Sequence, residues 1–322
     1  MKRGLYTRIT LAGLLGLTLF ACSSCVYVHT GGMDTPRHER ELQLAAPLTA
    51  GSSFSAETGD GSISVHGVET GECKVRATVV AHARTEERAQ ELAEQVQVTL
   101  EPAGNGLKVV TNGPQVIAKA WYSVSLDVQV PNQTSLTLST GDGAVHIANL
   151  TGNVDAQTGD GSIEIETVKG NVKLHTSDGG VACTRLEAET VDVHTGDGGI
   201  TFTNVRANNL TARTGDGSIR GREIAADRAD CHTSDGSIHL DYAQDAPKAP
   251  NVTATTSSGG ITFTAPPGLS AVIEASTGDG SIHTSLPITI EGKVGGRSLT
   301  GRLGDGKGRI GLRTHDGSIT IR

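Results

Sequence analysis

An acidic residue recurs at nearly constant spacing through most of this chain of 322 residues. It stands at the centre of a six-residue phrase, which is clearest as Thr-Gly-Asp-Gly-Ser-Ile at residues 158–163. The ten central positions are Asp60, Asp142, Asp160, Asp178, Asp197, Asp216, Asp235, Ser258, Asp279 and Asp316. The five intervals from Asp142 to Asp235 are 18, 18, 19, 19 and 19 residues. A period this regular predicts one structural unit that is copied along an axis.

If the units stack, the acidic residues of successive units form a row of carboxylates. Carboxylates and turn carbonyls are the ligands that Ca²⁺ prefers. The residues of this candidate metal row are Asp160, Asp178, Asp197, Asp216 and Asp235. The phrase resembles the Gly/Asp-rich calcium β-roll repeats, but those have a period of about nine residues and an acidic residue at both turns. Here the other turn reads Val-Lys-Gly-Asn at residues 168–171.

A structural role competes with calcium binding. An Asp can accept backbone hydrogen bonds within a tight turn, and Gly can supply a positive φ. Ser258 occupies one of the central positions, and a Ser suits a turn better than it replaces a carboxylate ligand. We therefore expect no cofactor, with Ca²⁺ as the alternative.

Histidines form a second row, three residues before the central position. His175, His194 and His232 share this place, and Arg213 interrupts them. His175 and His194 belong to adjacent units and could chelate a transition metal if both point outward. The alternative is an exposed polar face, and we expect no metal site here.

Catalytic motifs are missing from the sequence. It contains no Gly-x-Ser-x-Gly elbow, H-E-x-x-H motif or P-loop. Cys183 and Cys231 occupy inward positions of the repeat, as small core residues do. A shared turn explains a repeated Asp, whereas an active site is built once. We therefore predict that the protein is not an enzyme; a carbohydrate-active β-helix enzyme is the alternative.

Trp121 and Tyr122 are the candidate binding residues. They place the single Trp of the chain beside one of its four Tyr. The competing interpretation is that both aromatic side chains cap an open end of the core.

The residues around each central position alternate between apolar and polar. Thr stands two before it and Gly one after it in all ten copies, and Ile or Val stands three after it. Alternation with period two on both sides of a turn predicts two short strands per repeat. We predict an all-β fold, a β-solenoid-like stack of 18–19-residue two-strand repeats with parallel ladders about 4.8 Å apart. An antiparallel sandwich remains the alternative.

The repeat domain is expected at residues 50–322, with regular repeats at 132–245. A small α+β insert at 67–131 contains one short helix, for which Thr85 is the predicted N-cap. Residues 102–106 predict a hairpin turn in the same insert. Looser repeats and a C-terminal cap fill residues 246–322, where residues 303–312 predict a second hairpin.

The first residues have the pattern of an export signal. Lys2, Arg3 and Arg8 precede the apolar run of residues 9–20. Leu-Phe-Ala-Cys at residues 19–22 resembles a bacterial lipobox, which implies a signal peptide at 1–21 and lipidation of Cys22. Residues 22–49 would then be the lipidated Cys and a tether. Ser23 after that Cys points to the outer membrane.

The charge of the exported body restricts its partners. Cleavage removes three positive charges and no negative charge, so the formal net charge changes from −8 to −11. An acidic body argues against nucleic acid as a partner. The expected partners are the membrane, through the N-terminal lipid anchor, and a protein or glycan of the envelope or cell surface.

The lipobox, the strand–helix–strand lead-in, the V-x-V-P strand at residues 128–131 and the repeated phrase resemble one bacterial family. Its members are β-strand repeat lipoproteins of unknown function that are labelled candidate adhesins. The resemblance covers residues 50–322 and implies surface exposure with a binding or scaffolding role. It supplies no catalytic residues. A periplasm-facing accessory protein in envelope stress sensing or assembly is the alternative function.

Overall fold

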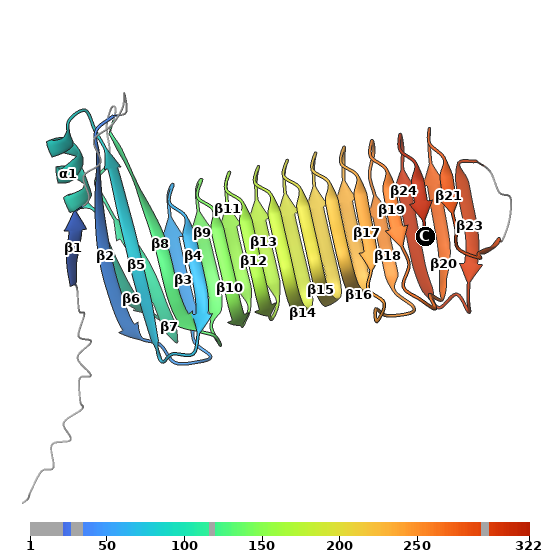
Figure 1. The fold of residues 1–322 in the computed structure, drawn as a ribbon, viewed down its shortest axis with the longest axis horizontal. Helices are drawn as coiled ribbons and strands as arrows, with labels where there is room; N and C mark the ends of the chain where they lie inside the picture. Colours follow the sequence, from blue (N-terminus) through green and yellow to red (C-terminus); the bar gives the residue numbers. More distant parts are fainter. Residues whose placement is uncertain (1–21, 27–34, 116–119, 291–295) are drawn as a thin grey trace, which may run out of the picture.

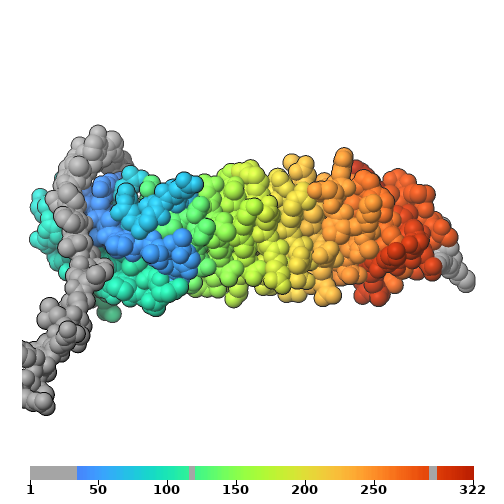
Figure 2. All heavy atoms as spheres, turned by 90° about the horizontal axis from the view of Figure 1, so that it is seen from below, coloured from blue at the N-terminus to red at the C-terminus, as the bar shows by residue number. Residues whose placement is uncertain are grey.

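We analysed a computed structural model, which describes residues 22–26, 35–115, 120–290 and 296–322. The molecule is a long stack of strands with one helix at its N-terminal end (Figure 1). Seen from below, the stack is a continuous rod (Figure 2). Among the described residues, no helix is both long and apolar enough to cross a membrane.

The N-terminal part of the chain forms ten strands and the helix: β1 (Cys22–Val26), β2 (Arg37–Pro47), β3 (Ser53–Thr58), β4 (Ile63–Val68), β5 (Glu72–His82), α1 (Glu86–Gln95), β6 (Gln97–Ala103), β7 (Gly106–Asn112), β8 (Trp121–Pro131), β9 (Ser135–Thr140) and β10 (Val145–Thr151). The regular repeats form β11 (Val154–Thr158), β12 (Ile163–Lys169), β13 (Val172–Thr176), β14 (Val181–Thr195), β15 (Ile200–Thr214), β16 (Ile219–Thr233) and β17 (Ile238–Tyr242). The C-terminal part forms β18 (Asn251–Thr255), β19 (Ile261–Thr264), β20 (Ala271–Thr277), β21 (Ile282–Thr284), β22 (Thr289–Ile290), β23 (Ser298–Leu303), β24 (Gly308–Thr314) and β25 (Ile319–Ile321).

Each repeat is one coil with a strand on either side of its Gly-rich turn. Strand β11 pairs in parallel with β13, and β12 pairs in parallel with β14. The partners are residues one period apart, such as Val154 with Val172. The β-solenoid prediction is therefore confirmed, because an antiparallel sandwich would not pair equivalent residues of successive repeats.

The core lies inside the coils and follows the predicted alternation. In one coil, Val154 and Ala156 on β11 and Ile163 and Ile165 on β12 are all buried. The residues between them point outward, as the exposed Asp155 does. A single coil cannot enclose these side chains, so burial requires the neighbouring coils.

A second bend in each regular coil falls at a residue with left-handed backbone conformation. This residue stands four positions after the Ile or Val that follows the turn, and its φ lies between 54° and 61° in five successive coils. The five residues are Asn149, Thr167, Arg185, Asn204 and Glu223. The ladder skips each of them, and the next residue, such as Leu186, points inward again. Of the residue types found at these five positions, only Asn favours this conformation, so no residue pattern marks the bend in the sequence.

The N-terminal end is closed by an antiparallel extension of the stack. Strand β8 pairs in parallel with β4 and antiparallel with β5, which pairs in turn with β2. The predicted hairpin forms between β6 and β7. The predicted N-cap is confirmed, because the Thr85 hydroxyl accepts a hydrogen bond from the Arg88 amide.

The tether predicted at residues 22–49 is too long, because its C-terminal part belongs to the folded body. Residues 37–47 form β2, which pairs with β5 over eleven residue pairs. The Arg40 guanidinium donates hydrogen bonds to carbonyl oxygens at the end of α1 and beyond it, among them those of Ala93 (3.1 Å) and Val96 (3.1 Å). The strand was missed in the sequence because its outward positions carry polar side chains, so that its composition resembles that of a linker. The signal peptide at 1–21 lies outside the described residues.

The C-terminal end differs from the sequence-based expectation. Strand β24 lies between β18 and β20, and β25 lies between β19 and β21. The last repeat of the chain therefore sits inside the stack, as the position of the C-terminus in Figure 1 shows. The hairpin predicted at residues 303–312 is wrong, because β20 separates β23 from β24.

Candidate functional site

The Gly-rich turns are joined to one another by backbone hydrogen bonds. The amides of Gly159 and Asp160 both donate to the carbonyl oxygen of Gly141, at 2.5 Å and 3.3 Å. The same pair of bonds recurs from coil to coil, as between Gly215, Asp216 and the carbonyl of Gly196. Each central residue after Asp60 therefore joins its turn to a neighbouring one through its main-chain amide.

Hydrogen bonds between coils explain why Thr recurs at the same position of every copy of the phrase. Thr176 is fully buried, and its hydroxyl donates to the carbonyl oxygen of Gly161 in the preceding coil at 2.9 Å. It also accepts a hydrogen bond from the amide of Gly179 at 3.2 Å. All ten threonines of this column are buried. They satisfy turn groups that would otherwise lie unpaired beside the core.

The Gly after the central residue is required by close packing. A Cβ atom built on Gly198 would lie 1.9 Å from the carbonyl oxygen of Gly179, and one on Gly217 would lie 1.9 Å from that of Gly198. The described glycines with positive φ are elsewhere in the chain. The expectation that these turn glycines supply positive φ is therefore wrong; they allow successive turns to approach each other.

The Asp carboxylates lie exposed along the ridge of turns. Within the described ranges no backbone group donates to them, so the predicted turn hydrogen bonds of the Asp side chains are also wrong. A side-chain hydrogen bond on this row joins the Ser258 hydroxyl to the Asp235 carboxylate at 2.9 Å, and Asp279 is ion-paired with Arg297. No group of three or more potential metal ligands gathers anywhere in the described part of the chain. The candidate residues Asp160, Asp178, Asp197, Asp216 and Asp235 form a line rather than a cage.

The predicted histidine pair lies side by side. His175 and His194 are register partners on neighbouring strands. Nε2 of His194 lies 3.0 Å from Oδ1 of Asp192, a half-exposed neighbour that the sequence analysis did not single out. No third ligand joins the pair among the described residues. Calcium and transition-metal binding remain untested hypotheses.

The thiols are unsuited to nucleophilic chemistry. Cys73, Cys183 and Cys231 are free and buried. Burial raises the pKa of Cys73 to about 12 and also raises that of Cys183. Burial and the negative charge of Asp230 raise the pKa of Cys231 to about 12. The thiolate is the reactive form, so these side chains act as core residues.

Trp121 and Tyr122 point to opposite faces of β8. The indole of Trp121 is 48% exposed and is the only exposed large hydrophobic side chain among the described residues. It stacks on the imidazole of His82, with ring centroids 4.0 Å apart and an interplanar angle of 13°. The predicted role as a core cap is thus wrong for Trp121, while Tyr122 is half-buried.

Tyr122 lines a cavity of about 480 Å³ above the first Gly-rich turn. Lys108, Thr111 and Asp60 are among the other lining residues. The first turn has no Gly-rich turn before it, and no described carbonyl accepts from the amides of Gly59 and Asp60. The buried hydroxyl of Thr111 also lacks a partner among the described residues. The cavity therefore offers free hydrogen-bonding groups to a ligand.

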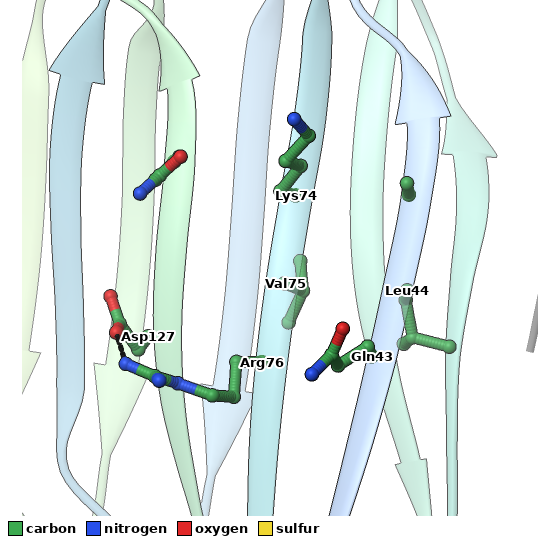
Figure 3. A pocket seen from close by; sticks show the side chains of 8 residues that line it. Gln43, Leu44, Lys74, Val75, Arg76 and Asp127 are labelled. Carbon is green, nitrogen blue, oxygen red and sulfur yellow. Dashed lines mark hydrogen bonds and ion pairs between the residues drawn. The ribbon is translucent and has the colours of Figure 1, made fainter. Parts of the chain in front are cut away.

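The outward face of β2, β5 and β8 carries a second hollow, of about 380 Å³ (Figure 3). Gln43, Lys74, Arg76, Asp127 and Gln129 supply its polar groups. Arg76 and Asp127 form an ion pair across the two strands, and this contact raises the pKa of the guanidinium. Trp121 and Asp127 belong to the same face of β8 because residues on alternate positions share a face. Sequence reasoning missed this hollow, since its residues come from three separated strands.

Comparisons with known proteins found one matching family and several similar solved structures. The family model described as Toastrack DUF4097 matches residues 62–322. A candidate adhesin from Bacteroides fragilis is 11% identical, with 88% of this chain and 97% of that one covered and a TM-score of 0.44. A candidate lipid-binding protein from Parabacteroides distasonis is 12% identical, with 89% and 97% covered and a TM-score of 0.45.

A candidate cell adhesion protein from Clostridium sporogenes is 12% identical, with 87% of this chain and 97% of that one covered and a TM-score of 0.24. The search of curated proteins found no match.

Proposed function

This chain belongs to the Toastrack DUF4097 family, and from that premise we propose that it is an exported, non-enzymatic binding protein of the bacterial cell envelope. The observation that carries the proposal is the exposed indole of Trp121, stacked on His82 at one end of a polar sheet face. The remaining outward surface of the repeats serves as a rigid scaffold.

The binding surface is a strip along β8. Asp127 follows Trp121 by six positions, which corresponds to about 20 Å at 3.3 Å per residue. An aromatic face lies at one end of the strip and amide and charged side chains lie at the other. Indole rings offer apolar area at little cost in conformational entropy, while the polar groups fix orientation. This combination suits an extended oligosaccharide better than a small ion.

The lipid anchor is the second part of the proposal. Strand β1, which begins at Cys22, pairs antiparallel with β2, and β2 lies between β1 and β5 in the strip-bearing sheet. A lipid on Cys22 would hold this end of the stack near the membrane, and Ser23 favours the outer membrane. Such an arrangement favours a glycan of the cell's own envelope over a glycan on another cell.

Binding to purified envelope polysaccharide of the producing cells tests the strip. We expect Trp121→Ala and Asp127→Asn each to weaken binding at least tenfold, because they remove the aromatic face and the ion-pair partner of Arg76. Thr203→Ala, on the outward face of the distant β15, is the control and should bind like the unaltered protein. Unchanged binding by both strip variants, with folding verified by thermal melting, would show that the strip is not the binding surface.

Cell fractionation tests the anchor. Cys22→Ala should move the protein from the membrane fraction to the soluble exported fraction. Protease treatment of intact cells then distinguishes a surface location from a periplasm-facing one, since only a surface-exposed protein is cleaved. If Cys22→Ala stays in the membrane fraction, lipidation of Cys22 is not what holds the protein there.

A further inference from the structure

Two arginines without acidic partners lie next to each other on the rod, far along the stack from the N-terminal strip. Arg220 and Arg222 occupy successive outward positions of β16, and both are exposed. Within the described ranges, neither forms an ion pair or a hydrogen bond. Ion pairs with carboxylates hold many of the other arginines: Arg37, Arg76, Arg88, Arg185, Arg206, Arg213, Arg297 and Arg309.

The two guanidinium groups line a hollow of about 320 Å³ together with Ser237, His239 and Asp241. Arg220 and His239 are register partners on adjacent strands. The Asp241 carboxylate lies 3.1 Å from Nε2 of His239. The one acid of the hollow is therefore engaged by the imidazole rather than by an arginine.

The strand on the other side adds no acidic group. Thr201 pairs with Arg220, and Thr203 pairs with Arg222. The hollow thus contains two free guanidinium groups, a hydroxyl, an imidazole and the Asp241 carboxylate held by that imidazole, and it is bordered by two further hydroxyl-bearing side chains. Two neighbouring arginines without carboxylate partners contrast with the formal net charge of −8 of the whole sequence.

We propose that this hollow binds a phosphate group. Each guanidinium presents donors in a planar fork that matches two oxygens of an oxyanion, and phosphate has enough oxygens for both forks. The Ser237 hydroxyl supplies a further donor. Because the Asp241 carboxylate is engaged by His239, the two guanidinium groups are left to match the two charges of a phosphate dianion, whereas a single carboxylate leaves one of them without a partner.

Calorimetric titration of the full mature protein with inorganic phosphate tests the proposal. We expect one binding event, weakened at least tenfold by Arg220→Gln or by Arg222→Gln and lost in the double variant. Arg228→Gln is the matched control, because Arg228 is exposed on the same strand and lies outside the hollow. Absence of a phosphate signal, or an equal loss in Arg228→Gln, would overturn the proposal.

A second measurement identifies the source of the phosphate. Sedimentation with phosphatidylcholine vesicles, with and without phosphatidic acid, is compared for the unaltered protein and the double variant. Binding of the unaltered protein alone to the vesicles containing phosphatidic acid supports a lipid headgroup. Phosphate binding without vesicle binding supports a soluble phosphate compound. Trp121→Ala should give the same result as the unaltered protein in both measurements, because Trp121 lies outside the hollow. Failure of the glycan proposal would therefore leave both measurements interpretable.

Discussion

The threonine and glycine of each turn act as a pair between neighbouring coils. The Thr hydroxyl reaches the carbonyl oxygen of the preceding turn, and the Gly lets that carbonyl come close enough to be reached. Both residue types are therefore set by the contact between coils rather than by the conformation of a single turn. The central residue joins this contact through its main-chain amide, which Ser258 supplies as well as an Asp does.

Replacing a column threonine with its apolar isostere should destabilise the stack. Thr176→Val keeps the side-chain shape but removes the bonds to the Gly161 carbonyl and from the Gly179 amide. Because the site is fully buried, we expect a loss of about 1–3 kcal/mol in the free energy of unfolding. Chemical denaturation measures it. Thr201→Val, on the exposed face of β15, is the control; an equal loss there would contradict the explanation.

Repulsion between the Asp carboxylates of neighbouring turns should lower the stability of the folded protein at low ionic strength. Neighbouring coils bring these exposed carboxylates within about 5 Å of one another at the level of the backbone. Like charges opposite each other on adjacent strands destabilise by up to about 1 kcal/mol. Asp178→Asn should therefore raise the melting temperature in low salt, and the gain should fade in high salt as screening increases.

Asp279→Asn is the control for this charge effect, because Asp279 is ion-paired with Arg297 at 3.2 Å. Its replacement should give no gain in low salt. A lower melting temperature of Asp178→Asn in low salt would instead indicate that its carboxylate binds a cation or a donor.

The connection between β17 and β18 shows how the stack accommodates a repeat that is longer than the regular period. The segment between β17 and β18 is longer than in the regular coils, yet it is fixed at two points. Ala246 is buried, and Asp245 forms an ion pair with Arg206 on β15 at 2.9 Å. An expanded turn thus remains attached to the body of the stack.

The Asp245 contact predicts a pH dependence. The hydrogen bond from Arg206 lowers the pKa of the Asp245 carboxyl in the folded protein. Its contribution to stability is present above the pKa of the unfolded chain and is lost as the pH falls through the folded-state pKa. Asp245→Asn should therefore melt below the unaltered protein at neutral pH, and the difference should vanish in acid. Asp155→Asn, an exposed Asp without a described partner, should show no such trend.

At the scale of the whole molecule, both ends of the rod are built from segments out of sequence order. At the N-terminal end, the coil of β3 and β4 lies between β7 and β8 on one side and β9 and β10 on the other. At the other end, β24 and β25 separate β18 and β19 from β20 and β21. The chain terminus thus holds the last coils together.

Removing the final strand pair should open this end of the rod. A chain that stops after Lys307 lacks β24 and β25, so β18 and β20 lose their common neighbour. We expect rapid proteolysis within residues 246–307, while the regular repeats stay protected. A chain that lacks only Arg322 is the control and should resist like the full chain. Protection of residues 246–307 in the longer deletion would show that these coils can pair directly.

The sequence by itself determined the coil. Its period set which residues pair, and its alternation set which side chains enter the core, because both depend on neighbours at fixed separations along the chain. It also marked the N-cap at Thr85 and the lone Trp121. It did not reveal why the turns need Gly, since that reason is a contact between coils.

Only the tertiary structure decided the order of the coils at both ends and the composition of the surface sites. The place of β24 depends on which open edge it joins, and a strand carries no local signal for a distant edge. The same holds for Arg76 with Asp127 and for Arg220 with His239, which come from separate strands. Residue patterns along the chain determine the single coil, whereas pairing between distant strands determines which residues lie together in a surface site.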